Sequence, residues 1–214
     1  MTASKVSTNN PIAFPASSGL DEETARSELY GLLAGVLYAY PAIELIAQIR
    51  AAATDAPAAG AFFFFFWRNF VGVTRSMTDQ AIHDEYEALF GGMSKPEVYL
   101  YGSHYLSGFL NEKPLARLRT DLNNLGLERS EAMSDTEDHF AYLCEVMRYL
   151  IAGEDVAVAN LTRQREFFST HIQPWANLMC DDIQSNTKAH FYTSLAELIR
   201  AFMGIEAQGF DMLV

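Results

Sequence analysis

The chain contains little of what several classes of protein require. Only Cys144 and Cys180 of its 214 residues are cysteines, which excludes a disulfide framework and favours a reducing compartment. Its 13 glycines and 7 prolines are too few for a fibrous or low-complexity protein. The longest apolar run, residues 61–67, is far shorter than the ~20 residues that span a bilayer. The first 20 residues contain no apolar stretch of signal-peptide length. We therefore expect a cytoplasmic protein without stable membrane insertion.

Positive charge is also scarce. The chain has 15 lysines and arginines against 27 aspartates and glutamates, and its formal net charge is −12. Such a surface repels phosphates and anionic lipid headgroups, so we expect neither nucleic acid nor an anionic membrane as a partner. Residues 131–214 hold thirteen of the acidic residues and only five of the basic ones. The charge favours a basic partner, and most of the acidic excess lies in the last third of the chain.

Apolar residues recur at helical spacing along most of the chain, as in the series Leu29, Leu32, Leu33 and Val36. No segment has the alternation of a strand, and no internal repeat is present. The pattern predicts an all-α fold, a single helical-bundle domain of about nine helices over residues 21–214, preceded by a flexible N-terminal arm at residues 1–20. The expected helices cover residues 21–40, 43–53, 61–77, 79–90, 114–125, 135–151, 155–171, 174–185 and 188–204. A capping box, Ser134 with Glu137, is expected to start the sixth of these helices.

Five consecutive phenylalanines occupy positions 62–66 and are followed by Trp67. The run has no period, but the neighbouring segments are helical, so we expect a helix. An exposed run of this kind would promote aggregation. We therefore predict that it lies in the core.

The common enzyme motifs are absent. The chain has no G-x-S-x-G, H-E-x-x-H, C-x-x-C or G-x-G-x-x-G. No two of its five histidines lie four residues apart, so no shared metal site is expected, and we predict neither a metal nor a cofactor. Residues 91–95 are interpreted as the end of a helix rather than as a phosphate loop. Cys144 is expected to be a buried thiol.

Two clusters each allow two interpretations. Glu137, Asp138 and His139 are either an ordinary helix start, where carboxylates favour the helix dipole, or a polar rim that can receive a guanidinium. The aromatic stretch around Tyr86, Phe90 and Tyr101 is either the edge of the core or the wall of a peptide-binding groove. Local chemistry leaves both choices open.

Three blocks of residues, in order along the chain, resemble one protein family. The first comprises residues 85–90 and 101–106 and resembles a Leu-Phe pair followed by Trp-Gly-Ser-x-Tyr-Leu. The second comprises residues 137–139 with Leu143 and Met147 after them. The third consists of Phe168, His171, Ile172, Trp175, Phe191, Tyr192, Leu195, Ala196 and Phe202. Together they resemble the TorD/DmsD/NarJ family of cytoplasmic chaperones, which mature bacterial molybdenum redox enzymes.

The resemblance implies an all-helical chaperone rather than an enzyme. Such a chaperone binds the twin-arginine signal peptide of a molybdoenzyme catalytic subunit and delays its export until cofactor is loaded. The residues carried over as peptide contacts are Tyr86, Leu89, Phe90, Tyr101, Asp138 and His139. With the family in view, Glu137 joins Asp138 as a carboxylate that can bind arginine.

Several alternatives remain open at this stage. One is a metal-dependent helical hydrolase using Asp138 and His139, and another is a nucleotide-binding regulator. We expect a monomer, with a domain-swapped dimer as the alternative. The sequence does not name the client, which can be a dimethyl-sulfoxide, trimethylamine-oxide or nitrate reductase or a formate dehydrogenase.

Overall fold

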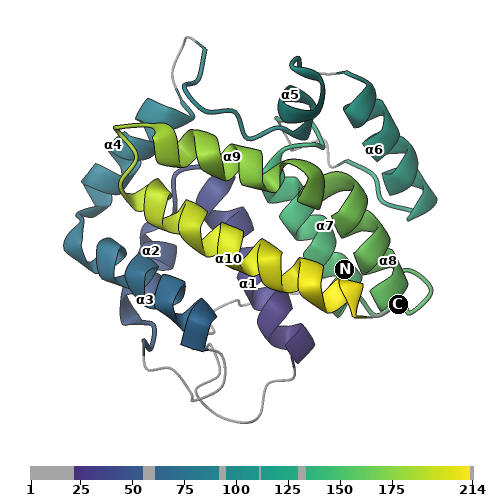
Figure 1. The fold of residues 1–214 in the computed structure, drawn as a ribbon, viewed down its shortest axis with the longest axis horizontal. Helices are drawn as coiled ribbons and strands as arrows, with labels where there is room; N and C mark the ends of the chain where they lie inside the picture. The colour runs from purple at the N-terminus through teal and green to yellow at the C-terminus, as the bar shows by residue number, and fades with distance from the viewer. Residues whose placement is uncertain (1–21, 55–60, 92–94, 111, 130–133, 213–214) are drawn as a thin grey trace, which may run out of the picture.

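The computed structural model describes residues 22–54, 61–91, 95–110, 112–129 and 134–212, which fold as one all-α domain (Figure 1). The expected all-α class is therefore confirmed, while the expected arm at residues 1–20 lies outside the described residues. The helices are α1 (Glu22–Leu37), α2 (Ile43–Ala51), α3 (Ala61–Ser76), α4 (Asp79–Leu89), α5 (Gly102–Ser107), α6 (Lys113–Asn124), α7 (Phe140–Ala152), α8 (Leu161–Phe167), the π-helical η1 (Phe168–Ile172), α9 (Gln173–Ser185) and α10 (Phe191–Asp211).

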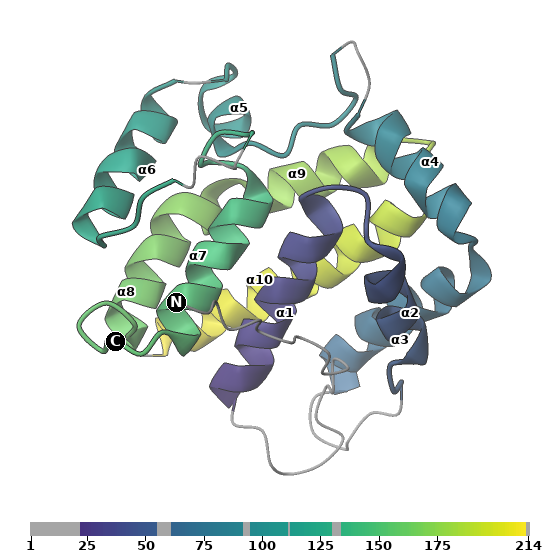
Figure 2. The same cartoon turned by 180° about the vertical axis from the view of Figure 1, so that it is seen from behind.

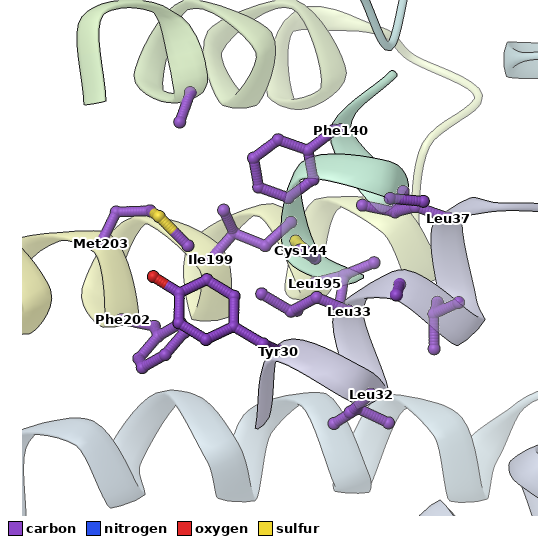
Figure 3. Packing of buried hydrophobic residues seen from close by; sticks show 14 of the residues in the cluster. Tyr30, Leu32, Leu33, Leu37, Phe140, Cys144, Leu195, Ile199, Phe202 and Met203 are labelled. Carbon is purple, nitrogen blue, oxygen red and sulfur yellow. The ribbon is translucent and has the colours of Figure 1, made fainter. Parts of the chain in front are cut away.

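Helix α1 lies at the centre of the core, against α7 and α10 (Figures 2 and 3). Tyr30 and Leu33 of α1, Cys144 of α7 and Ile199 of α10 are fully buried and lie together in Figure 3. Burial raises the pKa of the Cys144 thiol well above its ordinary value. The expected role of Cys144 as an inert core thiol is confirmed.

Two buried carboxylates tie the C-terminal helix to the rest of the core. Glu206 of α10 accepts hydrogen bonds from Arg26 at 2.6 and 2.8 Å and from the Tyr30 hydroxyl at 2.9 Å. At the other end of α10, Glu85 of α4 accepts three N–H groups at 2.7 to 3.0 Å. Those donors are the first backbone amides of the helix, which otherwise have no acceptor. Both contacts fix α10 against elements more than 100 residues away in sequence.

The phenylalanine run is helical, as expected, but the expectation that it lies in the core is only half right. Phe62 and Phe65 are 69% and 58% exposed, whereas Trp67 and Phe70 are fully buried. Successive residues of a helix point about 100° apart, so five in a row point in every direction and cannot all face one core. The helix period decides which rings are buried.

Several predicted boundaries are wrong. Helix α1 ends at Leu37, three residues before Tyr40, and residues 155–160 precede α8 instead of belonging to it. The capping box is wrong as well: α7 begins at Phe140, and its N-cap is His139. Helix α5 was not expected, because it is only six residues long. Among the described residues, no helix is long and apolar enough to cross a bilayer.

Candidate functional site

The segment before α7 contains a turn at residues 136–139 and is bonded to the segment before α5. Tyr101 and His139 form an antiparallel bridge. Beside it, Gly102 donates its N–H to the Asp138 carbonyl at 2.9 Å, and Phe140 donates to the Leu100 carbonyl at 2.8 Å. The first two family-like blocks therefore meet here, although Gly102 and Asp138 are 36 residues apart in sequence.

Asp138 is only 3% exposed and is engaged on both oxygens. Oδ2 accepts the backbone N–H of Ser103 at 2.8 Å, and Oδ1 accepts the Thr136 hydroxyl at 2.6 Å. Asp138 was expected within the first turns of a helix, but it precedes α7 and binds the first turn of α5. Its carboxylate holds two chain segments together.

His139 is the N-cap of α7 and is 4% exposed. Its Nδ1 accepts the N–H of Ala141 at 3.2 Å, which requires Nδ1 to be unprotonated. Burial lowers the pKa of His139 to about 4, and it outweighs the opposing effect of the Asp135 and Asp138 carboxylates. His139 is therefore neutral at pH 7, as a cap must be.

Two tyrosine rings contact this cap, and two further tyrosines, on α4 and after α1, bond to each other. The His139 ring lies edge-on to Tyr101, with centroids 5.0 Å apart, and tilted against Tyr142 at 5.5 Å. The Tyr101 hydroxyl donates to Asp135, and burial followed by that bond raises the pKa of Tyr101. On α4, the Tyr86 hydroxyl donates to the Tyr38 carbonyl at 3.3 Å, and burial raises the pKa of Tyr86 to about 12. The Tyr86 and Tyr101 phenols stay protonated and act as donors.

The carried-over residues on α4 differ in accessibility. Leu89 is fully buried in the core. Phe90, just after α4, is half-buried, and its ring stands edge-on to Tyr192 at 4.9 Å. Tyr86 is also half-buried and lies 6.1 Å from the same ring. Among these three residues, Tyr86 and Phe90 retain exposed surface for a ligand, whereas Leu89 has none.

Glu137 lies beside an apolar groove of about 480 Å³ between α1, α7 and the segment that follows α6. These helices face the viewer in Figure 2. The groove is open on one side, and its charged lining residues are Glu128, Glu137, Glu145 and Arg129. The other residues that line it are Ala34, Gly35, Tyr38, Leu122, Leu127, Ala141, Tyr142, Val146 and Tyr149. Three carboxylates thus border an apolar channel, which we call the acidic groove.

Asp138 lines a different hollow, of about 370 Å³, between α5, α6 and the start of α9. Gly102, Ser103 and Trp175 line the same hollow. Glu137 and Asp138 are the two central residues of a turn that the His139 N–H closes on the Thr136 carbonyl at 3.0 Å, and they line separate hollows. The structure does not bring these two carboxylates to one guanidinium.

Sequence reasoning missed most of the acidic groove. Tyr38 follows the last turn of α1, and Tyr142 lies three residues after His139, one helical turn away. Glu145 follows Tyr142 by another three residues, so helical spacing from His139 would have found both. Glu128 and the residues near it follow α6 and carry no comparable signal. Among the described residues, no group of three potential metal ligands is present.

The family model for the nitrate reductase delta subunit matches residues 53–181 of the chain. The match covers more than half of the chain and includes α4, α5 and the segment before α7. The chain belongs to this family. Its members are chaperones that mature redox enzymes, so the resemblance seen in the sequence is confirmed. A search of curated proteins found no match to the chain.

Proposed function

We propose that this delta-subunit family member binds the twin-arginine leader of a molybdoenzyme catalytic subunit in the cytoplasm. It holds the apo-subunit until cofactor is loaded and releases it for export afterwards. Family membership supports the chaperone role, and the acidic groove supports the ligand. The proposed site comprises this groove and the aromatic cluster of Tyr38, Tyr86, Tyr101 and Tyr142 that adjoins it.

The groove has the chemistry that such a leader requires. A twin-arginine leader carries two guanidinium groups followed by an apolar stretch. The lining of the groove is mostly apolar, which suits the stretch, and Glu128, Glu137 and Glu145 can receive the guanidiniums. This pairing of an apolar channel with three carboxylates is the observation that carries the proposal.

Two of the groove carboxylates, Glu137 and Glu145, are already paired, but with partners that a ligand can replace. Arg119 contacts Glu137 at 2.8 Å and Arg148 contacts Glu145 at 3.0 Å, and both guanidiniums are about half exposed. Exposed pairs of this type contribute ~0–1 kcal/mol. A leader arginine can therefore replace Arg119 or Arg148 at little cost in free energy, because the leader also makes apolar contacts of its own.

The test is calorimetric titration of the purified chain with a synthetic leader peptide. Replacing Glu137 and Glu145 together by glutamine is expected to weaken binding ~10-fold or more, since each lost charge-assisted bond contributes ~1–2 kcal/mol. A leader with both arginines changed to glutamine is expected to bind wild type and variant equally weakly.

A matched control is available on α8 and the loop before it. Glu166 forms an i,i+3 pair with Arg163 at 3.1 Å, at the same spacing as Glu145 with Arg148 but with the arginine first. Changing Glu154 and Glu166 to glutamine removes the same two charges away from the groove and is expected to leave affinity within about twofold. Equal weakening by both double variants would show that net charge, rather than the groove, binds the leader.

A further inference from the structure

The exposed face of α3 has large side chains in one half and small ones in the other. Phe62 and Phe65 project from the N-terminal half and are 69% and 58% exposed. Towards the C-terminus, Gly72, Val73 and Ser76 border a hollow of about 380 Å³ together with Phe65, Arg68 and Asn69. A Cβ atom built on Gly72 meets nothing within 4 Å. One face of α3 therefore has large exposed rings in its N-terminal half and small residues that border a hollow in its C-terminal half.

We propose that this face binds the same face of a second copy of the chain, forming a two-fold symmetric dimer. In an antiparallel pair of α3 helices centred at Asn69, Phe65 lies opposite Val73 of the partner, because both are four residues from the centre. Phe62 lies opposite Ser76 in the same way, seven residues from the centre. Each copy then places its exposed rings against the small half of the other, as a self-complementary interface requires.

Charge supports a second copy as the occupant. Glu197 of α10 accepts a hydrogen bond from Asn69 at 2.9 Å, so this carboxylate lies beside the centre of the face. Arg68, next to Asn69, is exposed. Around a two-fold axis at Asn69, two guanidiniums and two carboxylates gather, and their charges balance. A net charge of −12 on each copy opposes association elsewhere on the surface, which makes this locally neutral face the favourable one.

The dimer leaves the acidic groove open. Helices α3 and α10 face the viewer in Figure 1, while α1, α6 and α7, which border the groove, face the viewer from the opposite side in Figure 2. Dimerisation through α3 is therefore independent of leader binding in the acidic groove. It differs also from a domain swap, because each copy keeps all its helices.

Sedimentation velocity from about 1 µM to about 200 µM, the range suited to a weak dimer, is the first test. We expect a concentration-dependent dimer for wild type. Phe65→Glu and Gly72→Leu, which fills the hollow with a good helix former, are both expected to remain monomeric. Phe109→Glu, a matched change at a ring that is 71% exposed on another face, is expected to dimerise like wild type.

A disulfide at the axis gives an independent test. Asn69→Cys is expected to form a covalent dimer under mild oxidation much faster than Asn177→Cys, an exposed asparagine on α9. The native cysteines are both buried and do not compete. A wild type that is monomeric throughout, a dimer that persists in Phe65→Glu or Gly72→Leu, or equal cross-linking of the two cysteine variants would each overturn the proposal.

Discussion

The carboxylate of Asp138 accepts the backbone N–H of Ser103 at 2.8 Å and thereby joins the start of α7 to the start of α5. Asp138 is buried, and its second oxygen is bonded to the Thr136 hydroxyl. Replacing a buried, doubly bonded carboxylate leaves donors without acceptors, which costs ~1–3 kcal/mol. The site is therefore built around a bond that maintains the fold.

Asp138→Asn is expected to lower the free energy of unfolding by ~1–3 kcal/mol in urea titrations followed by circular dichroism. Asp84→Asn is the control, since its side chain is 67% exposed, and it is expected to change stability by less than ~0.5 kcal/mol. Equal stability of the two variants would contradict a structural role for Asp138. A lower leader affinity of an Asp138 variant can therefore result from its lower stability rather than from a lost contact with the leader.

His139 makes stability depend on pH. Its pKa is about 4 in the folded chain and about 6.5 when unfolded, so between these values the unfolded state binds the extra proton. Stability is therefore present in full above about pH 6.5 and is lost as the pH falls towards 4, by ~3 kcal/mol from this group.

His139→Asn keeps a capping acceptor without a titrating ring, so its stability is expected to fall less steeply than that of wild type between pH 6.5 and 4. The measurement is the urea midpoint at half-unit pH steps. Since His171 titrates in both proteins, the difference between the two curves isolates residue 139. Parallel curves would show that His139 is not held neutral by the fold.

A side chain at position 102 would crowd a buried neighbour. A Cβ at this position would lie 3.0 Å from Trp175 Nε1, and the fully buried indole is held by its bond to the His171 carbonyl at 2.6 Å. Gly102→Ala is expected to lower the unfolding free energy by ~1–3 kcal/mol. Gly204→Ala, in α10, meets nothing within 4 Å and is expected to raise it by ~0.5–1 kcal/mol. Thermal denaturation of both variants distinguishes close packing from helix propensity, which favours alanine at both positions.

The sequence predicted the elements whose signal is local. The expected start of α4 at residue 79 agrees with the structure, and the expected start of α6 at 114 and end of α7 at 151 each lie one residue from the observed position. The start of α7 was mispredicted because Ser134 and Glu137 match a capping box, while the true cap, His139, is an uncommon one. Its orientation depends on the pairing with Tyr101, which no local pattern encodes.

The site was predicted in part. Family-like residues identified the segment around residue 138, but not that Asp138 and His139 are buried or that Glu137 faces another hollow. Burial depends on which helices pack together, and the acidic groove is lined by residues up to 115 positions apart in sequence, from Ala34 to Tyr149. Spacing within one helix cannot reveal such a groove.

The most direct test of leader binding in the acidic groove is the affinity of a synthetic twin-arginine leader for Val146→Trp. Val146 lines the groove, so the indole fills it, and calorimetry is expected to show affinity reduced at least ~10-fold. Val156→Trp, at a position that is 79% exposed and outside the groove, is expected to bind like wild type. If Val146→Trp folds and binds the leader as tightly as Val156→Trp, the leader does not occupy this groove.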